Sequence, residues 1–366
     1  MTRPARALIN LKALRHNLSR ARDAASGAKV MAVIKANAYG HGLLSVARSL
    51  NQADAFAVAR LDEGLQLRDA GVNAPVVLLS GVESSAELEE ARRHRLDIVV
   101  HSEHQIAMLE GAPSGTRLKA WLKLDSGMHR LGVAPEVFER SYARLSACRG
   151  VIETVSLMTH LADADAPESE RVNKQIAAFE AAALGITAER SIANSGGLLG
   201  WAEARADWVR PGIMLYGIAP FLNATGADHG LVPVMTVETR LIAVNRVDRG
   251  DRIGYGGTYT CDETMRIGVA AMGYGDGYPR HAPSGTPVLV GGVRCALAGR
   301  VSMDLITIDL RPNPEAKPGD RVVLWGKGLP AEEIATYAGT IPYELVCRMA
   351  PRVDYAELDD GPASDL

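Results

Sequence analysis

The chain has 366 residues, of which 47% are hydrophobic, and a formal net charge of −3 at pH 7. This length and composition predict a large buried core divided between two domains. The small negative charge gives no reason to expect nucleic acid or an anionic membrane as a partner, because both select clustered basic residues.

The first ten residues lack the features of a secretory signal, and no apolar run is long enough to span a membrane, so we expect a cytoplasmic protein. The four cysteines lie far apart and show no metal-ligand spacing. We therefore expect buried reduced thiols in preference to disulfides or a zinc site, and no bound metal.

From residue 11 to residue 233, apolar residues at helical spacing alternate with short apolar runs typical of buried strands. The first helix is expected over residues 11–25, and Ser84 with Glu87 fits a capping box at the start of another. Eight strand candidates alternate with helix-length segments, which favours a closed (β/α)8 barrel of the TIM type. An open doubly wound sheet is the alternative, but it would carry a GxGxxG motif after its first strand. The strands are expected at residues 30–34, 55–59, 75–80, 97–100, 118–124, 154–159, 191–193 and 208–216.

After residue 233 strand-like runs follow one another without helices and are joined by Gly-rich turns. This pattern predicts a mostly β domain over residues 234–366, with a frayed acidic tail at 357–366. Residues 1–10 are expected to form a strand that packs on this domain. The chain is thus expected to be an α/β protein, with a barrel over 11–233 and a C-terminal β domain. The strand-like runs are 236–245, 266–271, 287–290, 293–297, 305–310 and 321–325.

Lys35 follows the first strand of the predicted barrel, where burial would lower the pKa of its amine and make it a nucleophile toward a carbonyl cofactor. A surface lysine at the end of a strand is the alternative. Because the carboxyl ends of barrel strands meet at one mouth, polar residues that follow other strands are expected to gather with Lys35. They are Tyr39 after the first strand, Arg130 after the fifth, His160 after the sixth, Asn194 and Ser195 after the seventh, and Arg210 with Gly212 after the eighth.

Residues 32–42, AVIKANAYGHG, resemble the cofactor-lysine motif of the alanine racemases, which are pyridoxal-phosphate enzymes with a barrel and a C-terminal β domain. The resemblance spans residues 7 to about 353. It implies an isomerase that interconverts L- and D-alanine with pyridoxal 5'-phosphate as a homodimer, either for peptidoglycan precursors or for alanine catabolism. Further matches, in the family's order, are KLDSGMHRLG at 123–132, ANS at 193–195, RPGIMLYG at 210–217, GYG at 254–256, GYGDG at 273–277 and GRVSMD at 299–304.

The resemblance implies two proton-transfer groups on opposite faces of the substrate. Lys35 would hold the cofactor as a Schiff base and act on one face of the α-carbon, and Tyr255 of the partner subunit would act on the other. Because the pKa of a phenol is near ~10, Tyr255 needs a neighbour that stabilises its anion, in this family a histidine, here His160, linked to Arg210. A packing tyrosine in a turn and a satisfied core histidine are the alternatives.

By the same resemblance, Arg210 would face the pyridine nitrogen of the cofactor. A guanidinium has no acceptor, so the ring nitrogen would stay unprotonated and the ring would withdraw electrons weakly, which suppresses transamination. Related decarboxylases place a carboxylate there, so Arg210 argues against a decarboxylase. Taken alone, Arg-Pro-Gly is more often a turn with an exposed arginine.

The cofactor phosphate would be held by the Tyr39 and Ser195 hydroxyls and the backbone N–H groups of Gly212 and Ile213, with Asn194 also at the cofactor. Some family members have a further phosphate-binding tyrosine near the C-terminus. This chain has Pro351 at that position, so cofactor affinity would depend more on the other donors.

The substrate carboxylate would be bound by Arg130 and by the backbone N–H of the partner's Met303, while Tyr274 and Asp304 would shape the entrance. Lys123 matches a lysine that is often modified to N6-carboxylysine in this family, and the resulting anion would orient Arg130. An ordinary lysine in a barrel strand is the alternative for Lys123.

Two other functions fit the same family. A racemase acting on serine, lysine or arginine would use the same residues with a wider entrance. A non-catalytic pyridoxal-phosphate protein would retain Lys35 and the barrel, but it would have no need of a second domain that carries Tyr255.

Overall fold

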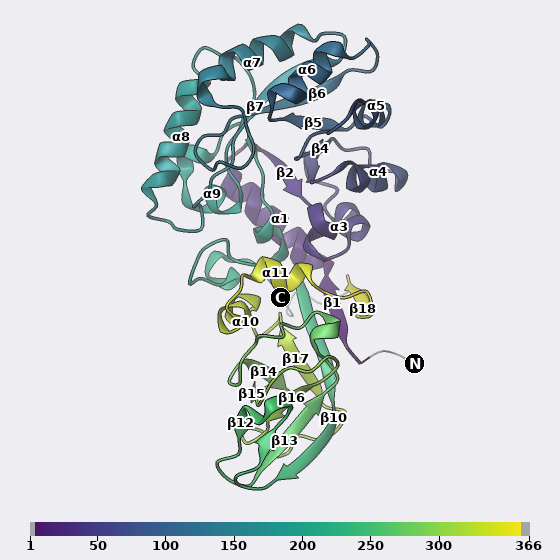
Figure 1. The fold of residues 1–366 in the computed structure, drawn as a ribbon, viewed down its shortest axis with the longest axis vertical. Coiled ribbons are helices and arrows are strands. Elements are labelled where there is room, and N and C mark those ends of the chain that lie inside the picture. Colours follow the sequence, from purple (N-terminus) through teal and green to yellow (C-terminus); the bar gives the residue numbers. More distant parts are fainter. Residues whose placement is uncertain (1–3, 360–366) are drawn as a thin grey trace. The chain divides into compact units, whose positions relative to one another are not determined.

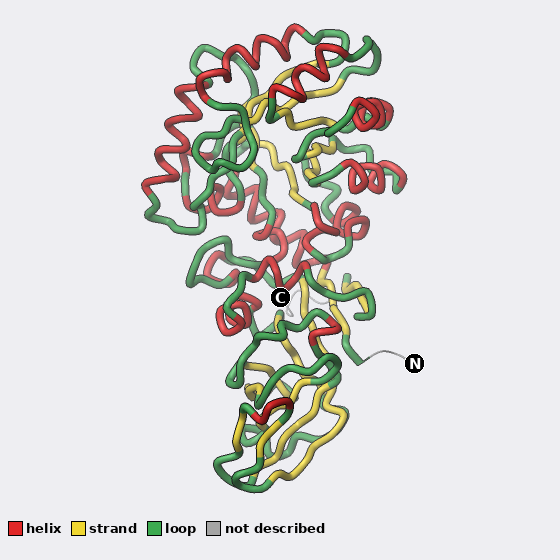
Figure 2. Tube along the Cα trace, in the orientation of Figure 1, coloured by secondary structure: helices red, strands yellow, loops and turns green. Residues whose placement is uncertain are grey.

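The computed structural model describes residues 4–359, and the chain divides into two compact units. One unit contains Arg15–Leu215 and Pro220–Asn223, and the other contains the remaining described residues. Figure 2 shows strands surrounded by helices in the first unit and mostly strands in the second. We keep the predicted boundaries at residues 10 and 233 as a proposal. Within residues 4–359, no helix is long and apolar enough to cross a membrane.

Eight parallel strands, β2 to β9, form a closed barrel in the first unit, which confirms the predicted fold class (Figure 1). The last strand closes the barrel by pairing Trp208 with Lys29 and Val209 with Val30. Most strand residues are buried because side chains fill the barrel and helices cover it. The strands are β2 (Lys29–Val33), β3 (Ala55–Val58), β4 (Val76–Leu78), β5 (Asp97–Val100), β6 (Leu118–Lys123), β7 (Ile152–Met158), β8 (Arg190–Ser191) and β9 (Trp208–Val209).

The barrel helices α5, α6 and α9 begin at a side chain that accepts a backbone N–H, and the helices bury apolar residues against the barrel. The predicted first helix, α1, is confirmed, and it buries Leu14, Leu18 and Ala21 at helical spacing. Ser84 precedes α5, and its hydroxyl accepts the N–H of Glu87 at 3.2 Å, as a helix cap does. The helices are α1 (Leu11–Ala25), α3 (Leu43–Ser49), α4 (Leu61–Asp69), α5 (Ser85–Arg93), α6 (Glu103–Gly111), α7 (Pro135–Ala147), α8 (Glu170–Ala182) and α9 (Ser195–Gly200).

The eighth barrel strand is shorter than the predicted run of residues 208–216. It ends at Val209, because Pro211 has no N–H for a strand ladder and Ile213–Tyr216 form a 3-10 helix. The Pro211 carbonyl still accepts the N–H of Val33 at 2.9 Å. Arg210 and Gly212 therefore lie on a loop at the carboxyl end of the barrel.

The second unit is built on an eight-stranded sheet with the order β13-β16-β15-β14-β17-β10-β1-β18. The first strand, β1, is antiparallel to β10 and parallel to β18. Because β13 also pairs with β10, the six strands from β13 to β10 in this order form a closed ring of hydrogen-bonded neighbours. The strands are β1 (Arg6–Asn10), β10 (Met235–Val247), β13 (Met265–Ala270), β14 (Pro287–Val290), β15 (Val293–Leu297), β16 (Ile306–Asp309), β17 (Arg321–Trp325) and β18 (Asp354–Leu358).

Other elements of this unit depart from the predicted pattern of strands alone. Two short helices, α10 (Ala331–Ala338) and α11 (Pro342–Cys347), precede β18, and β11 (Arg252–Ile253) pairs with β12 (Tyr259–Thr260) in a separate ribbon. The predicted frayed tail is wrong for Glu357 and Leu358, which pair with β1. Its residues 360–366 lie outside the described residues.

Candidate active site

Lys35 lies directly after β2, at the start of the turn α2 (Lys35–Tyr39), whose backbone is left-handed. The four residues after Lys35 have φ angles between 52° and 54°, although none is glycine. This conformation costs about 1–2 kcal/mol for each such residue, so the surroundings must hold the turn. The Glu63 carboxylate accepts the N–H of Ala36 at 2.6 Å, and the Asn37 side chain accepts the N–H of Leu43 at 2.8 Å. The half-buried Lys35 is thus fixed at the barrel mouth.

Four cationic side chains converge near this mouth: Lys35, Lys123, Arg130 and Arg210. Lys123 is the last residue of β6 and is buried, and loss of hydration is the main reason that its pKa falls to about 8. The charges of Arg210, Arg130 and Lys35 lower this pKa further, while Asp125 opposes them. So much positive charge in one place favours an anionic ligand.

Arg210 is buried, with only 5% of its surface exposed, which differs from an exposed turn arginine. One guanidinium nitrogen donates to Ser191 Oγ at 2.5 Å, and the other donates to the carbonyls of Thr159 at 2.5 Å and Ile192 at 3.2 Å. Burial lowers the pKa of Arg210 to about 10, so it stays charged at neutral pH. These bonds fix the guanidinium inside the barrel.

His160 follows β7 and is partly exposed. Loss of hydration lowers the pKa of its imidazole well below the usual range, and the charges of Arg210, Lys123, Arg130 and Lys35 lower it further. The imidazole is therefore neutral at pH 7. Within residues 4–359 the Arg210 guanidinium donates to the three oxygens named above, so its influence on His160 is electrostatic.

Tyr39, Ser195 and Gly212 meet at one place although they come from three different segments. A Cβ built on Gly212 would lie 2.6 Å from Tyr39 Oη, so only glycine allows this approach. The N–H of Gly212 donates to Ser195 Oγ at 2.8 Å, and the next residue, Ile213, is buried beside them. Two hydroxyls and a tight backbone turn thus form a small polar cradle.

Asn194 also has partners within the protein. Its Oδ1 accepts the N–H of Gly197 at 2.9 Å and caps α9, while its Nδ2 donates to the carbonyl of Leu161 at 3.4 Å. The side chain therefore supports the loop that presents Ser195 to the cradle.

Tyr255 is in the second unit, where 69% of its surface is exposed. It begins a glycine-rich turn, Tyr255–Gly257, in which Gly256 has a φ of 70°. The Arg252 guanidinium holds this turn by donating to the carbonyls of Gly257 at 2.9 Å and Gly256 at 3.2 Å. The phenol ring therefore projects from a braced turn and is not a packing anchor within the chain.

Tyr274, Met303 and Asp304 lie together on the second unit. The N–H of Tyr274 donates to the Ser302 carbonyl at 3.0 Å, and that of Gly275 donates to the Met303 carbonyl at 2.8 Å. Arg352 reaches the same segment and forms an ion pair with Asp304 at 2.8 Å. Met303 is 54% exposed and Tyr274 is 41% exposed, so both present apolar surface.

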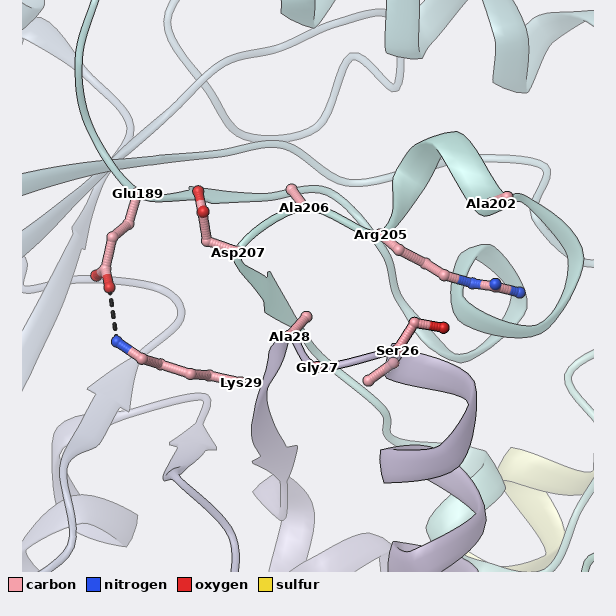
Figure 3. A pocket seen from close by; sticks show the side chains of 10 residues that line it. Ser26, Gly27, Ala28, Lys29, Glu189, Ala202, Arg205, Ala206 and Asp207 are labelled. Atoms are coloured by element: carbon pink, nitrogen blue, oxygen red, sulfur yellow. Dashed lines mark hydrogen bonds and ion pairs between the residues drawn. The ribbon is translucent and has the colours of Figure 1, made fainter.

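A pocket of about 570 Å³ lies at the opposite end of the barrel (Figure 3). Its lining includes residues at the amino ends of strands, such as Lys29, Glu189 and Asp207, and an ion pair of 2.8 Å joins the first two. Active sites of such barrels lie at the carboxyl ends of the strands. None of the candidate residues lines this pocket, so we do not assign the chemistry to it.

Several polar residues that support the mouth were not predicted from the sequence, namely Ser126, Thr159, Gln175 and Ser191. Gln175 had a detectable signal, because it is polar at a position where the apolar face of its helix continues. The others are short hydroxyl side chains whose partners are distant in sequence, so no local pattern marks them. In the described part of the chain, no group of His, Cys, Asp or Glu could hold a metal ion.

Comparison with known proteins gives matches over nearly the whole chain. The family models described as alanine racemase, N-terminal domain, and alanine racemase, C-terminal domain, match residues 9–220 and 234–356. The chain is 53% identical over 348 residues to the alanine racemase of Nitrosococcus oceani, covering 95% of this chain and 97% of that one. It is 49% identical over 353 residues to the biosynthetic alanine racemase of Escherichia coli, covering 96% and 98%. The crystal structure of biosynthetic alanine racemase from Pseudomonas aeruginosa is similar in fold, with a TM-score of 0.94, 42% identity, and coverage of 98% of this chain and 100% of that chain.

Proposed function

Because the chain belongs to the alanine racemase family, we propose that it interconverts L- and D-alanine with pyridoxal 5'-phosphate, in active sites completed across a homodimer. As a member of this family it is an isomerase. The observation that carries the proposal is the placement of Lys35, on a braced left-handed turn that leads directly into the cradle of Tyr39, Ser195 and Gly212. We retain the cytoplasm as its proposed compartment.

The cradle fits a phosphate. The Tyr39 and Ser195 hydroxyls and the backbone N–H of Ile213 would donate to it. The N–H of Gly212 donates to Ser195 Oγ, so it would be shared between that oxygen and the phosphate. The close approach of Gly212 to Tyr39 leaves no room for a side chain between them. Since Pro351 offers no hydroxyl, these four groups would carry the phosphate contacts. Lys35 would hold the cofactor through its amine.

Arg210 suits the pyridine nitrogen. A guanidinium has five N–H donors. Within residues 4–359 Arg210 makes three hydrogen bonds to protein oxygens, so N–H donors remain for a ring nitrogen. Because Arg210 is buried and charged, the ring nitrogen would accept a hydrogen bond and stay unprotonated. When bound, the cofactor acidifies the α-hydrogen of an attached amino acid by withdrawing electrons.

Racemisation then requires two protein groups on opposite faces of the α-carbon. Tyr255 of the partner subunit would remove the α-proton of L-alanine, and the amine of Lys35 would return a proton to the other face. The neutral imidazole of His160 can donate an N–H to the phenolate oxygen, which favours the anion that Tyr255 needs. The exposure of Tyr255 and Met303 in a single chain supports a second subunit that covers them.

Arg130 and Lys123 would recognise the substrate carboxylate. We propose that Arg130 pairs with it and that Met303 of the partner subunit donates its backbone N–H, with Tyr274 and Asp304 at the entrance. An amine must be neutral to add CO2, and the pKa of about 8 makes neutral Lys123 accessible near physiological pH. Carboxylation would replace a buried cation by an anion able to orient Arg130.

The test is an assay of purified protein, supplied with pyridoxal 5'-phosphate, on a panel of L-amino acids that includes serine, lysine and arginine. We expect loss of optical rotation with alanine far above the rest, and loss of both activity and visible cofactor absorbance in Lys35→Ala. A matched control is Lys317→Ala, which changes an exposed lysine of the second unit. Faster racemisation of a larger amino acid would show that this amino acid, and not alanine, is the preferred substrate. Normal visible absorbance in Lys35→Ala would refute the cofactor site.

A further inference from the structure

Gln175 is a glutamine on α8 with only 1% of its surface exposed, and it contacts the loop that carries His160. Its Oε1 accepts the N–H of Ala162 at 2.8 Å, and its Nε2 donates to the carbonyl of His160 at 3.1 Å. One side chain thus binds the main chain at His160 and two residues after it. Because Gln175 is buried and both bonds are partly buried, water competes with them less than it would at the surface.

The same carboxamide reaches a second loop. Its Nε2 lies 3.4 Å from Ser126 Oγ, which lies 2.7 Å from Thr159 Oγ1, and the Thr159 hydroxyl donates to the Leu124 carbonyl at 3.0 Å. Since Thr159 gives its proton to Leu124, Ser126 must donate to Thr159 and can accept from Gln175. A directed chain of hydrogen bonds therefore runs from Gln175 into the loop that bears Arg130.

This loop is itself held by several hydrogen bonds. Asp125 Oδ1 accepts the N–H groups of residues 127, 128 and 129, each at 3.0 Å, and so fixes the turn before Arg130. Arg171, one helical turn before Gln175, donates to the Gly127 carbonyl at 2.9 Å and pairs with Asp163 at 3.1 Å. Two side chains of α8 therefore join the loops after β6 and β7.

The network also ends on Arg210. Its guanidinium donates to the carbonyl of Thr159, whose hydroxyl belongs to the chain that begins at Gln175. A shift of the Gln175 carboxamide would therefore be transmitted to three groups of the candidate site, namely His160, Arg130 and Arg210.

We propose that Gln175 is a positioning residue that fixes His160 and the Arg130 loop relative to each other, and thereby sets the geometry of proton transfer by Tyr255 of the partner subunit. This inference rests on the function proposed above. Gln175 touches no reacting atom, so it acts through the placement of His160. Displacement of a catalytic group by about 1 Å can cost about 100-fold in rate, which sets the scale of the expected effect.

The chain offers a matched control in Gln105, a buried glutamine of α6 with 5% exposed surface. Its Oε1 accepts the N–H of His101 at 2.8 Å, and its Nε2 donates to the carbonyl of Val82 at 3.1 Å. Gln105 thus joins the loops after β4 and β5 as Gln175 joins those after β6 and β7. None of the candidate site residues lies on the loops that Gln105 joins, so its loss is the control for a structural effect. Gln105 approaches the site only through His101, whose imidazole interacts electrostatically with Lys123.

The experiment compares Gln175→Met with Gln105→Met in the full-length holoenzyme. Both variants replace a buried glutamine by a side chain of similar volume and lose its hydrogen bonds, three at Gln175 and four at Gln105 within residues 4–359, so we expect Gln105→Met to lower the melting temperature at least as much as Gln175→Met. Only Gln175→Met should lower kcat/KM for alanine, by about 10- to 100-fold. A second variant, Gln175→Glu, keeps the acceptor for Ala162 but loses the donor to His160, and it covers the case in which the methionine variant does not fold.

Kinetic isotope effects distinguish a positioning role from a purely structural one, because loss of stability alone would leave them unchanged. If the Tyr255 step becomes slow in both directions, the α-deuterium effect should rise for L-alanine, whose proton that residue removes. It should fall toward one for D-alanine, because the step that breaks its C–H bond then precedes the slow step. Gln105→Met should leave both isotope effects at the wild-type values.

Amide hydrogen exchange supplies a readout that does not depend on activity. In Gln175→Met, peptides covering residues 125–130 and 159–163 should exchange faster than in wild type, while in Gln105→Met they should not. Unchanged exchange in these segments, or isotope effects that change equally for both enantiomers, would overturn the inference. A wild-type protein that racemises no alanine would refute the proposed function and the catalytic half of this inference, and the exchange data would still decide whether Gln175 holds the two loops.

Discussion

Ser195 Oγ accepts the backbone N–H of Gly212 at 2.8 Å, and these two residues are 17 positions apart in the sequence. The bond joins the residue that begins α9 to the loop after β9, so two neighbouring strands of the barrel present their polar groups together. Because the Ser195 oxygen is the acceptor, its own O–H remains a donor for a ligand. The bond thus organises the cradle that we assign to the cofactor phosphate.

Gly212→Ala tests this cradle. The added methyl would lie 2.6 Å from Tyr39 Oη and would push the phenol away. We expect the dissociation constant of pyridoxal 5'-phosphate to rise by about 10-fold or more, with a stability loss of about 1–3 kcal/mol from overpacking. Absorbance titration and thermal unfolding measure the two effects.

The control for this change is Gly111→Ala, at the end of α6, where an added Cβ meets nothing within 4 Å. Its cofactor affinity should equal that of wild type. Equal affinity in Gly212→Ala as well would show that the phosphate binds elsewhere.

Arg210→Glu should shift the chemistry from racemisation toward transamination, because a carboxylate would keep the pyridine nitrogen protonated and strengthen electron withdrawal. The structure adds a stability cost: the introduced carboxylate would face the carbonyls that Arg210 now binds, and loss of these buried bonds should cost about 3–5 kcal/mol. Pyruvate formed per alanine racemised measures the shift. Arg205→Glu, far from the mouth, is the control, and a folded, cofactor-loaded Arg210→Glu without pyruvate would refute the role of the guanidinium.

Tyr255→Phe removes one proton-transfer group and leaves the other. We expect racemisation to fall by about 100- to 10,000-fold, the usual contribution of a general base. Exchange of the α-hydrogen with solvent should be lost mainly for L-alanine, since Lys35 can still act on D-alanine. Tyr355→Phe, at another exposed tyrosine of the second unit, should behave as wild type. Equal loss of exchange for both enantiomers would contradict assignment of the two residues to opposite faces.

The lowered pKa of Lys123 predicts how the free energy of unfolding changes with pH. Its pKa falls from 10.5 to about 8 on folding, mainly through burial. Between these pH values the unfolded chain binds a proton that the folded chain does not, so the free energy of unfolding should rise with pH, by up to about 3 kcal/mol. Lys123→Met should remove this rise, whereas Lys317→Met at an exposed lysine should retain it.

N-carboxylation of Lys123 also removes that titration, and native mass spectrometry distinguishes the modified protein by one added CO2. A flat stability profile above pH 8 in unmodified protein would mean that the folded amine keeps its proton up to its ordinary pKa, as it would if it were paired with an anion.

The barrel could be predicted from the sequence because its signals are local. Residues 11–25 carry a helical repeat that matches α1, and the apolar run that ends at Lys35 matches β2. The end of the eighth strand could not be predicted as easily, because the apolar residues 213–216 are as compatible with a strand as with the 3-10 helix that they form. In the second unit, β18 was missed because its residues are partly exposed and its pairing with β1 joins the two ends of the described chain.

Some residues of the candidate site could likewise be predicted from the sequence, and others could not. Lys35, Arg210 and Gly212 belong to recognisable stretches, so they could be named in advance. The left-handed turn after Lys35 could not, because alanines such as Ala36 and Ala38 ordinarily avoid positive φ. One bond that holds the turn comes from the Glu63 carboxylate, 27 positions from Ala36. The clamp formed by Gln175 depends on tertiary contacts between two loops and a helix.

The most direct test of the account is racemisation of L-alanine by the wild-type holoenzyme in deuterium oxide, followed at early times by mass spectrometry that resolves the two enantiomers. If Tyr255 and Lys35 serve opposite faces, the D-alanine formed should carry one deuteron at its α-carbon from the first turnovers, because Lys35 and not the substrate supplies that hydrogen. D-alanine that retains the substrate's hydrogen would contradict transfer by two separate groups.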